Sequence, residues 1–125
     1  MLGSSPIVAF LATTDISRAV AFFRDLLGLR LVEETPYAAV FDAGGTTLRV
    51  TPVDSFVPHR FTVAGWVVGD IVAAAGALAA AGTSTIRYDG MDQDDLGIWT
   101  TPGGDRVAWF ADPDGNVLSV TEFRA

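Results

Sequence analysis

The chain contains no cysteine and no lysine, and it has a single histidine among 125 residues. The lack of cysteine excludes disulfides, thiolate zinc sites and a cysteine nucleophile, and it is typical of a cytoplasmic protein. The net charge of −7 argues against a nucleic-acid partner, because such a partner requires a basic face. No apolar run approaches the ~18 residues of a membrane span, and the N-terminus lacks the basic region of a signal peptide. We therefore expect a cytoplasmic protein that binds neither nucleic acid nor membrane.

Two parts of the sequence resemble each other. The segment 6–28, PIVAFLATTDISRAVAFFRDLLG, aligns with the segment 61–82, FTVAGWVVGDIVAAAGALAAAG, and Asp15 then coincides with Asp70. Each half continues with short apolar segments and closes with a hairpin that contains glycine. Such internal similarity predicts that one structural unit occurs twice.

The order of elements within each half follows from local patterns. Asp15 and Asp70 are suitable N-caps, the apolar residues after them recur at helical spacing, and Gly28 and Gly82 suit the left-handed position that ends a helix. A short apolar strand precedes each helix. Strands are predicted at about 6–12, 29–34, 38–42 and 46–52 in the first half, and at 84–88, 96–101, 106–111 and 117–123 in the second.

These elements predict an α+β fold. Two tandem βαβββ modules would form a curved, mostly antiparallel sheet around a cleft. We expect a single domain over residues 1–125, with a first module at 6–53, a linker at 54–60 and a second module at 61–123.

The closing turn, ADPDGN, imitates the first ligands of a calcium-binding EF-hand loop. The imitation fails at the sixth position, which needs glycine and is Val117, and at the twelfth, which needs glutamate and is Phe123. A hairpin explains the same residues, because Pro113 fixes one torsion, Gly115 supplies a positive φ, and Asp and Asn side chains bond local backbone. The turn is therefore predicted to be structural.

The paired halves, the segment AFFRDLLG and the segment WFADPDGNVL together resemble the vicinal oxygen chelate superfamily. That superfamily includes glyoxalase I, extradiol dioxygenases, fosfomycin resistance enzymes and bleomycin resistance proteins. The resemblance extends from about Ile7 to Phe123. It implies the fold described above and a homodimer, but the fold alone does not define a function.

Metal-using members of this superfamily carry a ligand on the first strand and another on the last strand of each half. Carried onto this chain, the resemblance places those positions at Val8, Arg49, Val63 and Ser119. Divalent metals need carboxylate or imidazole ligands, which none of these residues supplies. The one histidine, His59, lies in the linker and cannot make a site alone. We therefore expect no metal and no other cofactor.

Strand alternation indicates which side chains share the cleft that the metal would have occupied. Arg49 is the one charged side chain predicted on this face of the cleft. Its guanidinium either binds a carboxylate or phosphate of a ligand, pairs with an acidic residue of the chain, or reaches solvent. Trp99 and Trp109 lie on strands whose register the sequence does not fix, and Trp99 is preferred because its strand continues into a polar segment. No catalytic residue stands out. The predicted ligand-binding residues are Phe10, Thr47, Arg49, Thr51, Trp99, Trp109, Ser119 and Thr121.

The leading functional hypothesis is a metal-independent protein, similar to the bleomycin resistance proteins, that binds a small organic ligand in the cleft. The cation at Arg49 disfavours a strongly cationic ligand and leaves anionic or neutral aromatic compounds. One alternative is a metal-dependent lyase or dioxygenase of the glyoxalase type. The other is a structural or interaction module that binds no small molecule.

Overall fold

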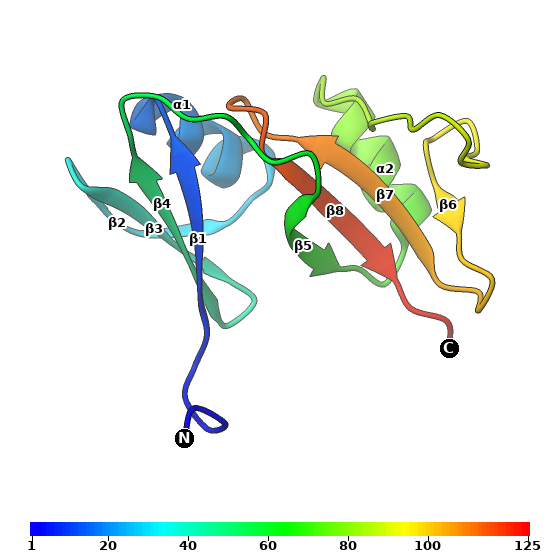
Figure 1. Ribbon diagram of the computed structural model, residues 1–125, viewed down its shortest axis with the longest axis horizontal. Coiled ribbons are helices and arrows are strands. Elements are labelled where there is room, and N and C mark those ends of the chain that lie inside the picture. Colours follow the sequence, from blue (N-terminus) through cyan, green and yellow to red (C-terminus); the bar gives the residue numbers. More distant parts are fainter. The chain divides into compact units, whose positions relative to one another are not determined.

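The computed structural model describes residues 1–125, which form two compact units, Met1–Val57 and Pro58–Ala125. Each unit contains one four-stranded mixed sheet and helical segments that pack on it (Figure 1). The α+β fold with two βαβββ modules is thereby confirmed. Neither helix has the length and apolar character that crossing a bilayer would require.

In the first unit, the last strand of the module lies beside the first. The strand order is β1-β4-β3-β2, in which β1 and β4 run parallel and the other neighbours run antiparallel. A parallel neighbour requires a crossover, which the helical segment between β1 and β2 supplies. The elements are β1 (Val8–Thr13), α1 (Ile16–Val20), the π-helical η1 (Ala21–Leu26), β2 (Arg30–Thr35), β3 (Ala38–Ala43) and β4 (Thr46–Pro52).

The helical segment of this unit begins as predicted and then widens. The Asp15 carboxylate accepts a hydrogen bond of 3.1 Å from the Arg18 amide, which caps α1. In η1 the Leu27 amide donates to the carbonyl five residues earlier, that of Phe22, at 2.9 Å. Phe23 is fully buried, and its ring centroid lies 5.7 Å from that of Phe41 on β3. The aromatic pair therefore forms the centre of the contact between helix and sheet.

The second unit repeats this topology with the order β5-β8-β7-β6 and a parallel pair of β5 and β8. The Asp70 carboxylate caps its helix by accepting from the Ala73 amide at 3.0 Å. The elements are β5 (Thr62–Val67), α2 (Ile71–Ala80), β6 (Trp99–Thr100), β7 (Arg106–Ala111) and β8 (Val117–Glu122).

A second carboxylate fixes the start of α2 to the sheet. Oε1 of Glu122, at the end of β8, accepts from the Ile71 amide at 3.0 Å, and its Oε2 accepts from the Arg106 guanidinium at 3.1 Å. Ile71 is fully buried, as are Phe110 and Leu118 on the strands. One side chain thus joins the helix and two strands around the core.

The prediction of a strand at 84–88 is wrong. This segment has no regular strand pairing, and a side chain takes the place of a neighbouring strand. The amide group of Gln93 accepts from the Tyr88 amide at 2.8 Å and donates to the Ile86 carbonyl at 2.9 Å. Because the Gln93 side chain satisfies these backbone groups, they need no hydrogen bonds to a neighbouring strand.

The strand predicted at 96–101 is shortened to β6. One oxygen of the Asp94 carboxylate accepts from the backbone amides of both Leu96 and Ile98 at 2.9 Å. Between them, Gly97 adopts a φ of +82°, which is a conformation outside the strand region. A local turn at Asp94 therefore competes with the strand and delays its start until Trp99.

The closing turn is held by hydrogen bonds among its own residues, as the sequence predicts. Oδ1 of Asp112 accepts from the amides of Asp114 and Asn116, at 3.0 and 2.9 Å, and Oδ2 accepts from the Asn116 side chain at 2.8 Å. Asp112 is buried, and this burial raises the pKa of its carboxyl against the lowering effect of the Asn116 hydrogen bonds. Gly115 has a φ of +90°, as the hairpin requires.

Removing the Asp112 carboxylate should destabilise the protein. We expect Asp112→Ala to lower the free energy of unfolding by about 1–3 kcal/mol, because buried donors lose their acceptor. Urea denaturation followed by tryptophan fluorescence measures this change. Asp92→Ala, which alters an exposed aspartate, is the matched control and should change the stability little. Equal effects of the two substitutions would contradict the role of the turn.

The pH dependence of stability provides a separate prediction for Asp112. Because its pKa is raised in the folded state, the folded protein holds this proton over a pH range in which the unfolded chain has released it. The contribution of Asp112 to the free energy of unfolding therefore falls as the pH rises through that range. As pH is lowered from neutrality to about 4, we expect wild type to gain stability relative to Asp112→Asn, which cannot titrate there. A relative loss in the same denaturation series would contradict the direction of the shift.

Candidate functional site

The open face of the first sheet brings four of the predicted residues together. In the parallel β1–β4 pair, Phe10 lies opposite Arg49, and alternation places Thr47 and Thr51 on the same face. Phe10 is 64% exposed, whereas Leu11, Leu48 and Val50, which alternate with the residues of this face, are buried. The predicted alternation in this half is therefore correct. Whether the four side chains bind a ligand stays a prediction.

Arg49 has no partner on this face. It makes no hydrogen bond or ion pair, and its neighbours on either side in the sheet are the apolar Phe10 and Val40. The acid nearest in register, Asp42, instead binds the Arg30 guanidinium at 3.4 Å and the Gly45 amide at 2.9 Å. An internal ion pair, one of the alternatives left by the sequence, is absent. The half-buried guanidinium therefore keeps its full capacity to bind an anion.

The open face of the second sheet collects the other four predicted residues. Trp109 lies opposite Ser119 in the β7–β8 pair, and Thr121 follows two positions later on the same face. Trp99 on β6 lies opposite Val107, which belongs to this face as well. The two indole rings stack at a centroid distance of 6.3 Å. Both tryptophans therefore belong to one surface, and the preference for Trp99 over Trp109 as a ligand contact stays a prediction.

Tyr88, which is not among the residues predicted from the sequence, extends this aromatic surface. Its ring meets that of Trp109 edge-on, at 5.3 Å between centroids. The Ile86 amide donates to the Trp109 carbonyl at 2.7 Å and so holds the segment 86–88 beside β7. No pattern in the sequence could have indicated this contact, because it depends on the irregular course of residues 84–88.

Ser119 lies in a notch of the same face. Its opposite neighbour on β5 is Gly65, where an added Cβ would overlap the Ser119 hydroxyl. Ser119 is only 8% exposed and its hydroxyl makes no hydrogen bond. Trp109 borders it on the other side. The arrangement leaves one free donor and acceptor recessed beside an aromatic wall, which is a common composition for a small-molecule site.

The residues present do not fit a metal ion. Of the four positions implied by the resemblance, Val8 and Val63 have no lone pair, Arg49 is a cation and Ser119 offers one hydroxyl. No three histidine, aspartate or glutamate side chains lie close enough together to hold an ion. The His59 ring stacks on Phe61 at 4.7 Å and belongs to no such group of three. The Lewis-acid chemistry of the superfamily therefore has no donors here.

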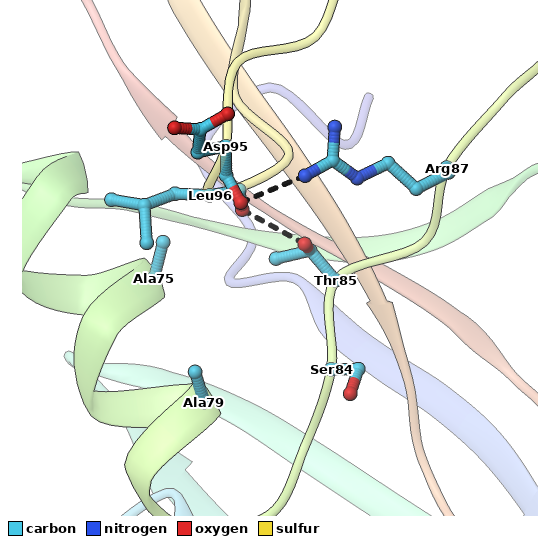
Figure 2. A pocket seen from close by; sticks show the side chains of 7 residues that line it. All are labelled: Ala75, Ala79, Ser84, Thr85, Arg87, Asp95 and Leu96. Carbon is cyan, nitrogen blue, oxygen red and sulfur yellow. Dashed lines mark hydrogen bonds between the residues drawn. The ribbon is translucent and has the colours of Figure 1, made fainter.

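A pocket of about 240 Å³ lies elsewhere in the second unit, between α2 and the segment that precedes β6 (Figure 2). It contains none of the predicted ligand-binding residues. The sequence gives no sign of this pocket, because one wall belongs to the segment 84–88, for which the apolar pattern predicts a strand. The lining residues are Ala75, Ala79, Ser84, Thr85, Arg87, Asp95 and Leu96.

Comparison with known proteins identifies the fold throughout the chain. The family model described as Glyoxalase/Bleomycin resistance protein/Dioxygenase superfamily matches residues 6–120. No curated protein matches the sequence.

Several solved structures share the fold. A member of this superfamily from Sphaerobacter thermophilus is 21% identical with a TM-score of 0.78, and the alignment covers 98% of this chain and 100% of that one. Lactoylglutathione lyase from Agrobacterium tumefaciens is 20% identical with a TM-score of 0.74, covering 95% and 93%. The fosfomycin resistance protein FosX from Listeria monocytogenes is 13% identical with a TM-score of 0.75, covering 97% and 94%. At these identities the similarity shows the fold alone.

The donor set leads to a prediction about metal content. After incubation with Zn²⁺, Ni²⁺, Mn²⁺ or Fe²⁺ and removal of free ions, the protein should contain no stoichiometric metal by elemental mass spectrometry, because the four positions supply no carboxylate or imidazole. Its melting temperature should be unchanged by a chelator. One ion per chain, removable by the chelator, would contradict this prediction and would require another set of ligands.

Proposed function

Because the chain belongs to the glyoxalase/bleomycin resistance protein/dioxygenase superfamily, we propose that it is a metal-independent member that binds a small organic ligand. The observation that supports this most directly is the recessed, unpaired hydroxyl of Ser119 beside the stacked rings of Trp99 and Trp109. The chain has no internal use for this hydroxyl. A ligand ring could lie on the indoles while one of its polar groups binds Ser119.

The charge on the first sheet favours a particular class of ligand. Arg49 presents a partnerless guanidinium on an open face, with the exposed ring of Phe10 beside it. A guanidinium binds carboxylate or phosphate through paired hydrogen bonds and repels cations. We therefore infer that a ligand of this face is a neutral or anionic aromatic compound, and that a strongly cationic drug is disfavoured there.

Sequestration is the mode of action that this composition supports. Neither open face offers a nucleophile with a neighbouring base. Binding alone requires only apolar area and a few oriented polar groups, which both faces supply. The metal-dependent lyase or dioxygenase alternative lacks its ligands, and a purely structural module would have no need of the unpaired Ser119 and Arg49.

We further propose that the protein acts as a cytoplasmic homodimer. The resemblance to the superfamily supports a dimer, and so does the edge strand β1, whose Val8 and Phe10 side chains remain exposed. Light scattering coupled to size-exclusion chromatography measures the mass. A mass of one chain at micromolar concentration would contradict this part of the proposal.

A ligand screen tests the binding function. Neutral, anionic and cationic aromatic compounds would be compared by thermal shift and by quenching of tryptophan fluorescence. We expect hits among the anionic and neutral compounds, and quenching of tryptophan fluorescence by those whose ring covers Trp99 and Trp109. Binding of cationic compounds alone, or of no compound in any class, would contradict the proposal.

Two variants then locate the contacts. Arg49→Gln should weaken binding of an anionic hit about tenfold, which corresponds to about 1.4 kcal/mol, and should leave neutral hits unchanged. Arg60→Gln removes an exposed arginine elsewhere and is the matched control. Ser119→Ala should weaken hits that carry a hydrogen-bonding group, whereas Ser17→Ala should not. Equal effects of a test variant and its control would assign the binding to another surface.

A further inference from the structure

The pocket beside α2 has a composition that the proposed function does not use. One wall is the helix, which presents the small side chains of Ala75 and Ala79, and the other is the extended segment with Ser84 and Thr85 (Figure 2). Leu96 closes the apolar part. The Thr85 hydroxyl donates to the Leu96 carbonyl at 2.8 Å. This hydrogen bond fixes the segment that contains Ser84 and Thr85 to the segment that contains Leu96. The walls are therefore defined by hydrogen bonds as well as by packing.

Two opposite charges line the same pocket without neutralising each other. The Arg87 guanidinium donates to backbone carbonyls, those of Asp95 at 2.8 Å and Gln93 at 3.4 Å, and pairs with no carboxylate. The Asp95 carboxylate makes no hydrogen bond or ion pair. Figure 2 shows that the guanidinium reaches toward the Asp95–Leu96 backbone, whereas the carboxylate turns to the other side of it. The guanidinium is thus held in place by backbone carbonyls, and both charges remain available to a ligand.

The size of the pocket limits what could occupy it. Its volume of about 240 Å³ equals the space of roughly eight water molecules and lies below the range of about 300–1,000 Å³ of sites for drug-sized ligands. A ligand with a few heavy atoms fits this volume, and an extended aromatic compound does not. The occupant therefore differs in class from the ligand proposed for the open faces.

We propose that this pocket binds a small zwitterion of the α-amino-acid class. Arg87 has unused N–H groups for the carboxylate, and Asp95 accepts from the ammonium group. A short aliphatic side chain would contact Ala75, Ala79 and Leu96, and the Ser84 hydroxyl provides one further polar contact. An amino acid carries its ammonium and carboxylate groups on one carbon atom, so one small molecule offers a partner to each of the two opposite charges that line the pocket. A simple anion or cation would leave one of them unpaired.

The test compares zwitterionic with singly charged probes on the full-length protein. Glycine, L-alanine and L-valine would be titrated into isotope-labelled protein and followed through backbone amide shifts, alongside propionate and propylamine. We expect saturable shifts for the amino acids at residues 84–87 and 95–97, and binding of the singly charged probes that is weaker by about tenfold or more. Equal binding of propionate would show a simple anion site instead, and no saturable shift for any amino acid would overturn the proposal.

Variants distinguish the pocket from other sites. Arg87→Gln and Asp95→Asn should each weaken L-valine binding about tenfold, whereas the controls Arg60→Gln and Asp92→Asn should not. Since Arg87 also holds the loop, Ala79→Leu provides an independent test, because its larger side chain fills the cavity while the loop contacts remain. It should abolish binding, and Ala80→Leu, also exposed on α2, should leave it intact. Unchanged binding in Ala79→Leu would contradict the assignment to this pocket.

Discussion

In each unit the first strand pairs in parallel with the last strand, and this pairing determines what the open face presents. A parallel pair requires a crossover, so a helix must cover one face of the sheet. The register then fixes which side chains remain on the other face: Phe10 beside Arg49 in the first unit, and Gly65 beside Ser119 in the second. A shift of one residue would bury Arg49 beneath the helix and expose Val50.

The sequence predicted the elements of the first unit well because its local signals agree with one another. Asp15 caps the helix, the apolar spacing continues to Leu27, and alternation along β1 and β4 separates the buried face from the open one. The same agreement fails in the second unit between the helix and β7. There Gln93 and Asp94 use their side chains as backbone partners, and such bonds replace strand pairing without any change in the hydrophobic pattern.

The candidate site was predictable only to the extent that it depends on strand parity. The residues of β1, β4 and β8 were assigned to the correct faces because alternation alone decides them. The position of Tyr88 and the stacking of Trp99 on Trp109 depend on the length of β6 and on the course of residues 84–88. The pocket beside α2 depends on the same irregular segment. Long-range packing of an irregular segment leaves no periodic trace in the sequence, so these features became visible only in three dimensions.

Arg49 does more than fail to donate an electron pair to a metal ion, because its positive charge also repels the ion. Two unit charges about 4 Å apart interact with about 4 kcal/mol at the effective dielectric near a protein surface, so a divalent ion at that distance would be repelled by about 8 kcal/mol. Restoring imidazole or carboxylate at the other implied positions would have to overcome this repulsion first. The same guanidinium would attract an anion by a comparable single-charge energy, before desolvation is subtracted. A partnerless arginine at this position therefore changes the sign of the charge that the face can accept, from a metal cation to an anionic or neutral ligand.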